Sequence, residues 1–184
     1  MRIIGGTRRG TKLFSLEGLD TRPSLDRVKE SLFNIINFDL EDSIILDLFS
    51  GSGALALESL SRGAKKAYLC DNNIKAIEII KKNVQKTRFE NEAIVINKSF
   101  EKALDFLKAD NIRFDIVFLD PPYSTDYATI ATKYIIDNDM LKDGGFIIIE
   151  TDEDERIKNN LIQDVEIYDN RKYGRVKLLF LRKK

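Results

Sequence analysis

The chain has 184 residues, with 30 basic and 30 acidic side chains, and 43% of its residues are hydrophobic. This length and composition predict one soluble globular domain, and no apolar run is long enough for a membrane-spanning helix. Because there is one cysteine, Cys70, and no histidine, zinc sites, Ser–His–Asp triads and internal disulfides are excluded, and we expect a cytoplasmic protein.

The zero net charge hides an uneven distribution of charge along the chain. Residues 1–12 hold four basic residues and residues 171–184 hold seven, and neither segment contains an acid. Residues 137–169 hold eleven acids and three bases. This asymmetry indicates a polyanionic partner for the basic ends. Charged chain ends without a partner are the alternative interpretation.

The first part of the chain predicts two short strands and a helix. The strands are Arg2–Ile4 and Lys12–Leu16, and a turn rich in glycine and arginine joins them. Apolar residues at helical spacing then predict a helix from Ser24 to about Asn37.

From residue 43 onward, strands alternate with helices. The predicted strands are 43–48, 65–70, 93–97, 114–119 and 146–150, followed by a closing hairpin of 165–168 and 176–181. The predicted helices are one that ends near Arg62, then 73–87, 100–109, 127–137 and 154–161. This pattern predicts an α/β fold with helices on both faces of a mostly parallel sheet and an antiparallel edge.

The first candidate site follows the strand 114–119. This apolar run ends at Asp120, and Pro121 and Pro122 prevent the strand from continuing. Open α/β sheets bind ligands at the carboxyl ends of their strands. There, the Asp120 carboxylate and the Pro121 carbonyl can accept both N–H bonds of a planar exocyclic amine, while Tyr123 stacks on the base. The alternative is an ordinary turn with a surface tyrosine.

The second candidate site follows the strand 43–48. Gly51 and Gly53 let a ligand approach backbone N–H groups at a helix start. Asp71 ends the next strand, where it can accept hydrogen bonds from a ribose, and Asp47 can meet an ammonium group or a water. The candidate cofactor-binding residues here are Asp47, Phe49, Ser50, Gly51, Ser52, Gly53, Asp71 and Asn72. Asn72 could instead cap the following helix.

The glycine loop alone does not identify the cofactor. Gly51-x-Gly53-x-x-Ala56 also fits the dinucleotide fingerprint, so NAD and S-adenosylmethionine are both compatible with its spacing. Asp47 and the D-P-P-Y turn favour methyl transfer to an amine, because hydride transfer has no evident use for such a turn.

Taken together, these motifs resemble a class I S-adenosylmethionine-dependent methyltransferase, and more closely the RsmD-type family of small-subunit ribosomal-RNA guanine-N2 methyltransferases. The resemblance covers nearly the whole chain. It rests on Met1–Gly6 and the basic turn that follows, Thr21–Pro23, Asp26–Glu30, Leu32–Asn34, Asp47–Gly53, Asp71, Asp120–Tyr123 and Lys172–Gly174. The amino-terminal motifs are the specific ones, since the glycine loop and D-P-P-Y also occur in unrelated amine methyltransferases.

The resemblance implies a seven-stranded sheet, S-adenosylmethionine as the methyl donor, and methylation of a guanine N2 amine in 16S rRNA within an assembling small subunit. Ser99 stands where the resemblance leads us to expect Asp or Asn near the adenine, and its hydroxyl can still bind adenine while Phe100 packs on it. The candidate phosphate-binding residues are Arg8, Arg9, Arg22 and Arg27. Alternatively, Arg22 and Arg27 pair with Asp26 or Glu30.

We expect a single domain, with residues 1–40 as an RNA-contacting extension and residues 41–184 as the catalytic core. We also expect a monomer without a metal ion. Three alternatives stay open from the sequence: a DNA adenine-N6 or cytosine-N4 amine methyltransferase, an NAD-binding oxidoreductase, and a ribosome-assembly factor that binds rRNA without catalysis.

Overall fold

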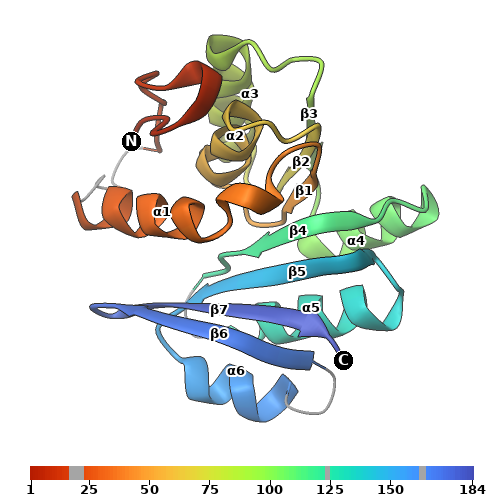
Figure 1. The fold of residues 1–184 in the computed structure, drawn as a ribbon. Coiled ribbons are helices and arrows are strands. Elements are labelled where there is room, and N and C mark those ends of the chain that lie inside the picture. Colours follow the sequence, from red (N-terminus) through yellow and green to blue (C-terminus); the bar gives the residue numbers. More distant parts are fainter. Residues whose placement is uncertain (17–22, 123–124, 162–164) are drawn as a thin grey trace.

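A seven-stranded sheet forms the centre of the molecule, in the order β3-β2-β1-β4-β5-β7-β6 (Figure 1). The structure is a computed structural model that describes residues 1–16, 23–122, 125–161 and 165–184. The strands are β1 (Ile44–Asp47), β2 (Lys66–Asp71), β3 (Ala93–Asn97), β4 (Phe114–Leu119), β5 (Leu141–Thr151), β6 (Val165–Tyr173) and β7 (Val176–Lys183). Strands β1 to β5 are parallel, and the β6–β7 hairpin joins β5 antiparallel. The predicted fold class is confirmed.

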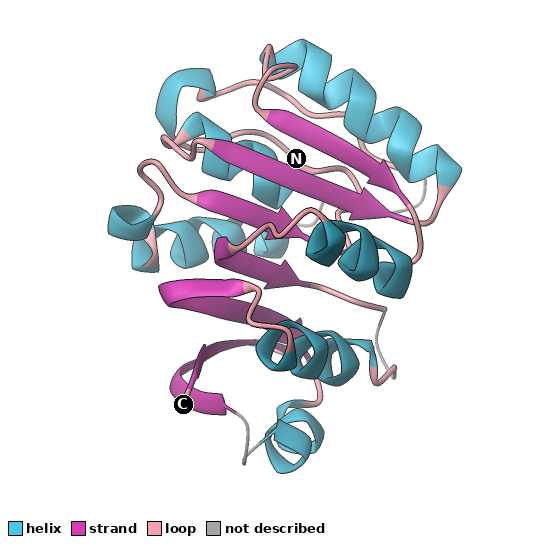
Figure 2. Ribbon diagram, turned by 90° about the vertical axis from the view of Figure 1, so that its right-hand side faces the viewer, coloured by secondary structure: helices cyan, strands magenta, loops and turns pink. Residues whose placement is uncertain are grey.

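Helices cover both faces of this sheet (Figure 2). On one face, here called the α1 face, lie α1 (Pro23–Ile35), α2 (Ala54–Ser61) and α3 (Ile74–Thr87), and on the other, the α4 face, lie α4 (Phe100–Ala109), α5 (Tyr127–Asp137) and α6 (Asp154–Leu161). Because strand side chains alternate between faces, Phe118 packs in the α1-face core and Val117 in the α4-face core. The central strands β1 and β4 are therefore apolar on both faces along most of their length.

Several element boundaries differ from the prediction. Strand β5 begins at Leu141 rather than Phe146 and includes Gly144 and Gly145. A side chain at position 145 would be 2.8 Å from the Phe114 carbonyl oxygen, so the close passage of β4 requires glycine there. The closing hairpin is also longer than predicted. None of the described helices has both the length and the apolar character needed to cross a lipid bilayer.

The amino-terminal segment forms a tight loop rather than the two predicted strands. Arg2 and Lys12 form an isolated antiparallel bridge, and residues Gly6–Arg8 form one turn of 3₁₀ helix. The predicted strands Arg2–Ile4 and Lys12–Leu16 are therefore wrong in extent, although the antiparallel direction is right. The glycines explain the difference, since Gly6 and Gly10 both have positive φ angles and bend the chain.

A fully buried carboxylate, Glu58 in α2, fixes this segment on the core. Its two oxygens accept hydrogen bonds from the backbone N–H groups of Ile4 and Gly5, each at 2.8 Å. The same carboxylate pairs with Arg62 Nε at 2.8 Å and with Lys29 Nζ of α1 at 3.4 Å. Glu58 thus joins the amino-terminal segment, α1 and α2 at one point.

Two further contacts explain why the segment lies so close to the core. A Cβ atom on Gly6 would be 1.7 Å from the Ser61 carbonyl oxygen, so only glycine allows this approach. The buried amide of Asn83 in α3 accepts the Phe14 N–H at 2.8 Å and donates to the carbonyl oxygens of Phe14 and Ser52, each at 2.9 Å. Asn83 therefore links the segment directly to the glycine loop.

We expect Glu58→Gln to destabilise the protein by about 3–5 kcal/mol, because removing one partner of a buried ion pair leaves the other charges uncompensated. Urea denaturation of wild type, Glu58→Gln and the exposed control Glu78→Gln in α3 measures this effect. A loss at Glu58 no larger than at Glu78 would show that the buried carboxylate does not hold the segment.

Candidate functional site

The two motifs found in the sequence meet at the carboxyl edge of the parallel strands. The glycine loop follows β1 and begins α2, and Gly51 and Gly53 have φ angles of 56° and 80°. The Ser50 N–H donates to the Cys70 carbonyl oxygen at 2.9 Å, which holds the loop against β2. A Cβ atom on Gly51 would meet nothing within 4 Å, so the loop borders open space. A ligand can therefore approach this backbone closely.

Asp47 at the end of β1 is a buried acid without a full set of partners. Its side chain is 2% exposed, and neither its Oδ2 atom nor the buried Ser50 Oγ atom has a hydrogen-bond partner. Burial raises the pKa of Asp47 to about 7, and the nearby Asp71 adds to this effect. Unpaired buried oxygens of this kind suit a cationic or hydrogen-bonding ligand.

Asp71 at the end of β2 has a structural role that the sequence did not predict. Its Oδ2 atom accepts the Gly51 N–H at 2.9 Å, and its Oδ1 atom accepts the Asn73 N–H at 2.8 Å. The carboxylate therefore orients the glycine loop and still has lone pairs for a ribose. Asn72 is exposed beside it, and the cap of α3 is Asn73, so the alternative capping role predicted for Asn72 is wrong.

An aromatic cluster borders the loop on the α4 side. The Phe49 and Phe100 rings are 5.5 Å apart, and Tyr127 at the start of α5 lies 4.8 Å from Phe100 and 6.3 Å from Phe49. Ser99 is the N-cap of α4, and its hydroxyl makes no capping hydrogen bond there. The structure brings the predicted residues Phe49, Ser99 and Phe100 to one place. Tyr127 was missed, although its position just after the D-P-P-Y turn was a usable signal.

The Asp120-Pro121-Pro122 turn follows β4 at the same edge. Pro121 is buried, whereas Asp120 and Pro122 are exposed, and Tyr123 lies outside the described residues. Just beyond, the Thr125 hydroxyl donates to the Pro122 carbonyl oxygen at 2.8 Å, and Arg156 of α6 donates to the Thr125 carbonyl oxygen at 2.7 Å. These contacts hold the turn beside the core.

Three carboxylates form a row across this edge: Asp47, Asp120 and Glu150 at the ends of β1, β4 and β5. Asp47 pairs in register with Phe118, and Leu119 pairs with Ile149, so Asp120 and Glu150 end adjacent strands at the same level. By strand alternation all three point to the α1 face. We call this set the carboxylate row. Glu150 was missed because only the strand order shows that β5 lies beside β4.

All three members of the carboxylate row have raised pKa values. Asp120 is open to solvent, yet the surrounding protein and the negative charges of Glu150 and Asp47 raise its pKa above the ordinary value. Burial also raises the pKa of Glu150. The row therefore attracts protons and cations. No group of three His, Cys, Asp or Glu side chains in the described ranges could hold a metal ion.

The predicted phosphate-binding arginines are in different environments. Arg9 and Arg27 are exposed and line a pocket of about 390 Å³ between the amino-terminal segment and α1, together with Arg2, Asp26 and Glu30. With the described residues Arg27 forms no ion pair, so pairing with Asp26 or Glu30 is not seen.

Arg8 does not join this pocket. Its Nε atom donates to the Thr87 carbonyl oxygen at 2.7 Å, and its guanidinium lies 5.4 Å from the centre of the Phe89 ring. Arg8 therefore attaches the amino-terminal segment to the end of α3. Arg22 lies outside the described residues.

A family model described as "Conserved hypothetical protein 95" matches residues 1–182. The chain belongs to this family. Ribosomal RNA small subunit methyltransferase D of Haemophilus influenzae is 42% identical over 158 residues, which cover 84% of this chain and 80% of that protein. The protein of the same name from Escherichia coli K12 is 37% identical over 152 residues, covering 83% and 75%. The solved structure of Escherichia coli yhhF has a TM-score of 0.83 and 32% identity, covering 100% and 98%.

Membership in this family confirms the resemblance that the motifs indicated, and with it the predicted class of S-adenosylmethionine-dependent methyltransferase. The residues present fit that cofactor. Asp47 has an unpaired buried oxygen, the glycine loop borders open space, and Asp71 is placed for hydroxyl groups.

Asp47 predicts how the stability of the unliganded protein varies with pH. Its pKa is about 7 in the folded chain and about 3.9 in an unfolded one. Between these values the folded state binds the additional proton, so the free energy of unfolding falls as pH rises from 4 to 7, by up to ~1.4 kcal/mol per pH unit for this group. Asp120 and Glu150 act in the same direction.

Asp47→Asn should remove the contribution of Asp47 to this pH dependence. The free energy of unfolding of the variant should therefore fall less than that of wild type between pH 5 and 7.5. Urea denaturation at several pH values compares the two slopes. Parallel slopes would show that Asp47 is not protonated in this range.

Proposed function

We propose that this protein transfers a methyl group from S-adenosylmethionine to the exocyclic N2 amine of a guanine in small-subunit (16S) ribosomal RNA. The observation that carries the proposal is the Asp120-Pro121-Pro122 turn, which follows β4 beside the glycine loop and within the carboxylate row. The names of the relatives from Haemophilus influenzae and Escherichia coli support rRNA as the substrate class.

In this proposal the glycine loop and the residues around it bind the methyl donor. S-adenosylmethionine supplies a methyl group on a positively charged sulfur, which is already activated for transfer. Asp47 faces a cationic group of the donor, Asp71 holds the ribose hydroxyls, and Phe49 and Phe100 provide the aromatic wall for the adenine with Ser99 at its edge. The loop residues Ser50, Gly51, Ser52 and Gly53 supply backbone groups.

Asp120 and Pro121 prepare the amine for attack. The lone pair of a guanine amine is delocalised into the ring, so the free amine is a poor nucleophile. The Asp120 carboxylate and the Pro121 carbonyl each accept one N–H bond, which favours a tetrahedral nitrogen whose lone pair points at the methyl group. The new C–N bond forms as the C–S bond breaks, and Asp120 accepts the released proton. Its raised pKa makes it a stronger base than an ordinary aspartate.

The extension of residues 1–40 contacts the RNA, with Arg9 and Arg27 at the pocket beside α1, while residues 41–184 carry the catalytic core. The acids of the carboxylate row repel phosphates and attract the amine, so the RNA backbone is held outside the row. We propose a cytoplasmic monomer that acts on an assembling small subunit, without a metal ion, and with Pro122 and Tyr123 positioning the base.

The test is transfer of labelled methyl groups to small ribosomal subunits from a strain that lacks the gene, with naked 16S rRNA and DNA as alternative substrates. We expect label in rRNA, recovered as N2-methylguanosine. Asp120→Asn should lower the rate at least about 100-fold, the usual size of a general-base effect. The matched control Asp137→Asn, an exposed aspartate that forms no ion pair with the described residues, should keep its activity.

Label in DNA alone would show that the substrate is a DNA base rather than rRNA, whereas the proposed methylation of an amine would still hold. Label in rRNA at another atom would overturn the guanine-N2 assignment. An active Asp120→Asn variant would remove the role given to Asp120.

The carboxylate row also predicts the pH dependence of methyl transfer. Burial and, after it, the negative charge of Glu150 raise the pKa of Asp120, so activity should rise with pH through that raised value. Glu150→Gln removes this charge and should shift the rising limb of the single-turnover rate to lower pH. If the pH at which the single-turnover rate rises stays unchanged and only the maximal rate falls, Glu150 acts on folding or binding instead.

A further inference from the structure

The β6–β7 hairpin extends past the edge of the sheet where the candidate site lies. Strand β5 pairs with β7 as far as Thr151 and Lys177, while the hairpin continues to its turn at Gly174 and Arg175. Figure 1 shows this tip beyond the ends of β4 and β5, on the same side as the amino end of α1.

The strand registers place the tip relative to Asp120. Leu119 pairs with Ile149, and Ile149 pairs with Leu179, so Asp120 is level with Leu178. Arg175 lies three residues farther along, about 10 Å past that level at ~3.3 Å per residue. Strand β7 is two strands from β4, or about 10 Å to the side. The tip therefore flanks the carboxylate row.

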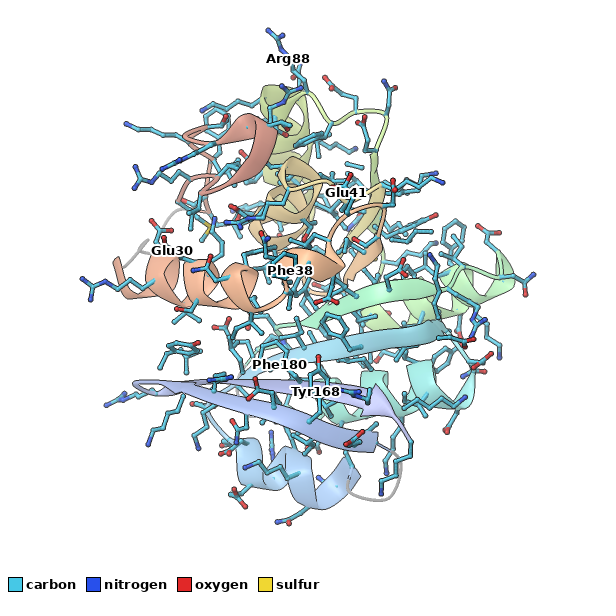
Figure 3. The ribbon with its side chains drawn as sticks, in the orientation of Figure 1. Glu30, Phe38, Glu41, Arg88, Tyr168 and Phe180 are labelled. Carbon is cyan, nitrogen blue, oxygen red and sulfur yellow. The ribbon has the colours of Figure 1, made fainter. Side chains whose placement is uncertain are left out.

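The ion pairs of the hairpin separate its cations into two groups. Toward its base, Lys183 pairs with Asp139 at 3.0 Å, and Arg182 pairs with Glu166 at 3.7 Å and lies 4.0 Å from the Tyr168 ring, which contacts Phe180 (Figure 3). Nearer the tip, Arg171 pairs with Asp169 at 2.9 Å and Lys177 pairs with Asp154 of α6.

Lys172 and Arg175 differ from these cations of the hairpin in their lack of ion-pair partners among the described residues. Both are exposed, and neither forms an ion pair with any residue that the structure describes. Lys172 also stands directly opposite Lys177 in the hairpin. Like charges in this arrangement destabilise a strand pair. Asp154 neutralises Lys177, but nothing described does so for Lys172, so folding gives no reason for a cation at this position.

The tip is nevertheless held in a fixed place. Tyr173 and Val176 are partly buried and pack against the α1-face core, and Gly174 takes the positive φ angle of 64° that the turn needs. Lys172 and Arg175 are therefore presented by an anchored turn, so ordering them on a ligand costs little backbone entropy.

We propose that Lys172 and Arg175 at the hairpin tip form a second phosphate-binding element for the RNA substrate. In Figure 1 the hairpin tip lies on one side of the amino end of α1, and the amino-terminal segment, which carries Arg9 of the basic pocket, lies on the other. This proposal rests on the proposed function, because the phosphates are those of the methylated RNA. The two basic elements hold the backbone on either side while the acids between them accept the base.

The test compares Lys172→Ala/Arg175→Ala with Lys65→Ala/Lys66→Ala. The control pair removes the same charge at the amino end of β2, the opposite end of the sheet, and its lysines also form no ion pair with described residues. Binding of a 16S rRNA transcript is measured from 50 to 300 mM KCl. The hairpin variant should bind at least about tenfold more weakly at 0.1 M salt, and its salt slope should fall by about 1–2.

The hairpin variant should melt no lower than wild type, since Lys172 and Arg175 are exposed and Lys172 faces another lysine. Both variants should bind S-adenosylmethionine like wild type, because exposed Lys65 and half-buried Lys66 also lie outside the cofactor residues. Wild-type binding that the hairpin variant retains in full would overturn this proposal and leave the proposed function standing. An equal loss in the control pair would also overturn it, because net charge would then be the cause. If wild type neither binds nor methylates 16S rRNA, the proposed function fails, and this inference fails with it.

Discussion

The arrangement of the site depends on the buried carboxylate of Glu58. Burying a charge is costly unless it is paired and hydrogen-bonded, and here two backbone N–H groups and two cations meet that requirement. The partners come from the amino-terminal segment, α1 and α2. These are the elements that form the basic pocket and carry the glycine loop, so one ionic cluster sets the distance between the proposed RNA surface and the proposed cofactor surface.

The edge of the sheet shows a second constraint, which works against stability. Asp47, Asp120 and Glu150 stand at the ends of three neighbouring strands, and burial raises the pKa of each. For Asp120 the negative charges of Glu150 and Asp47 add to this effect. A chain selected for stability alone would place neutral residues there. The cost is understandable if the site receives a cationic donor and an amine, because both ligands offset the negative charge.

The sequence predicted the elements well because buried parallel strands are short apolar runs separated by amphipathic helices. It also located Asp120 and the glycine loop, since both stand where an apolar run stops. Strand order was not accessible, so Glu150 had no visible relation to Asp120. Hydrogen bonds between residues far apart in the chain could not be predicted either, such as those of Glu58 with Ile4 and of Asn83 with Phe14. Arg8 was predicted to bind RNA, and its contact with Phe89 is a further role that the sequence did not show.

The attachment of the amino-terminal segment has a consequence for evolution and engineering. The segment is held by Glu58, Ser61 and Asn83, which belong to α2 and α3 of the core rather than to the segment itself. Grafting residues 1–16 onto another methyltransferase would therefore transfer the segment without the residues that bind it. The segment and these helices therefore form one structural unit, and an exchange of this part between relatives has to include both.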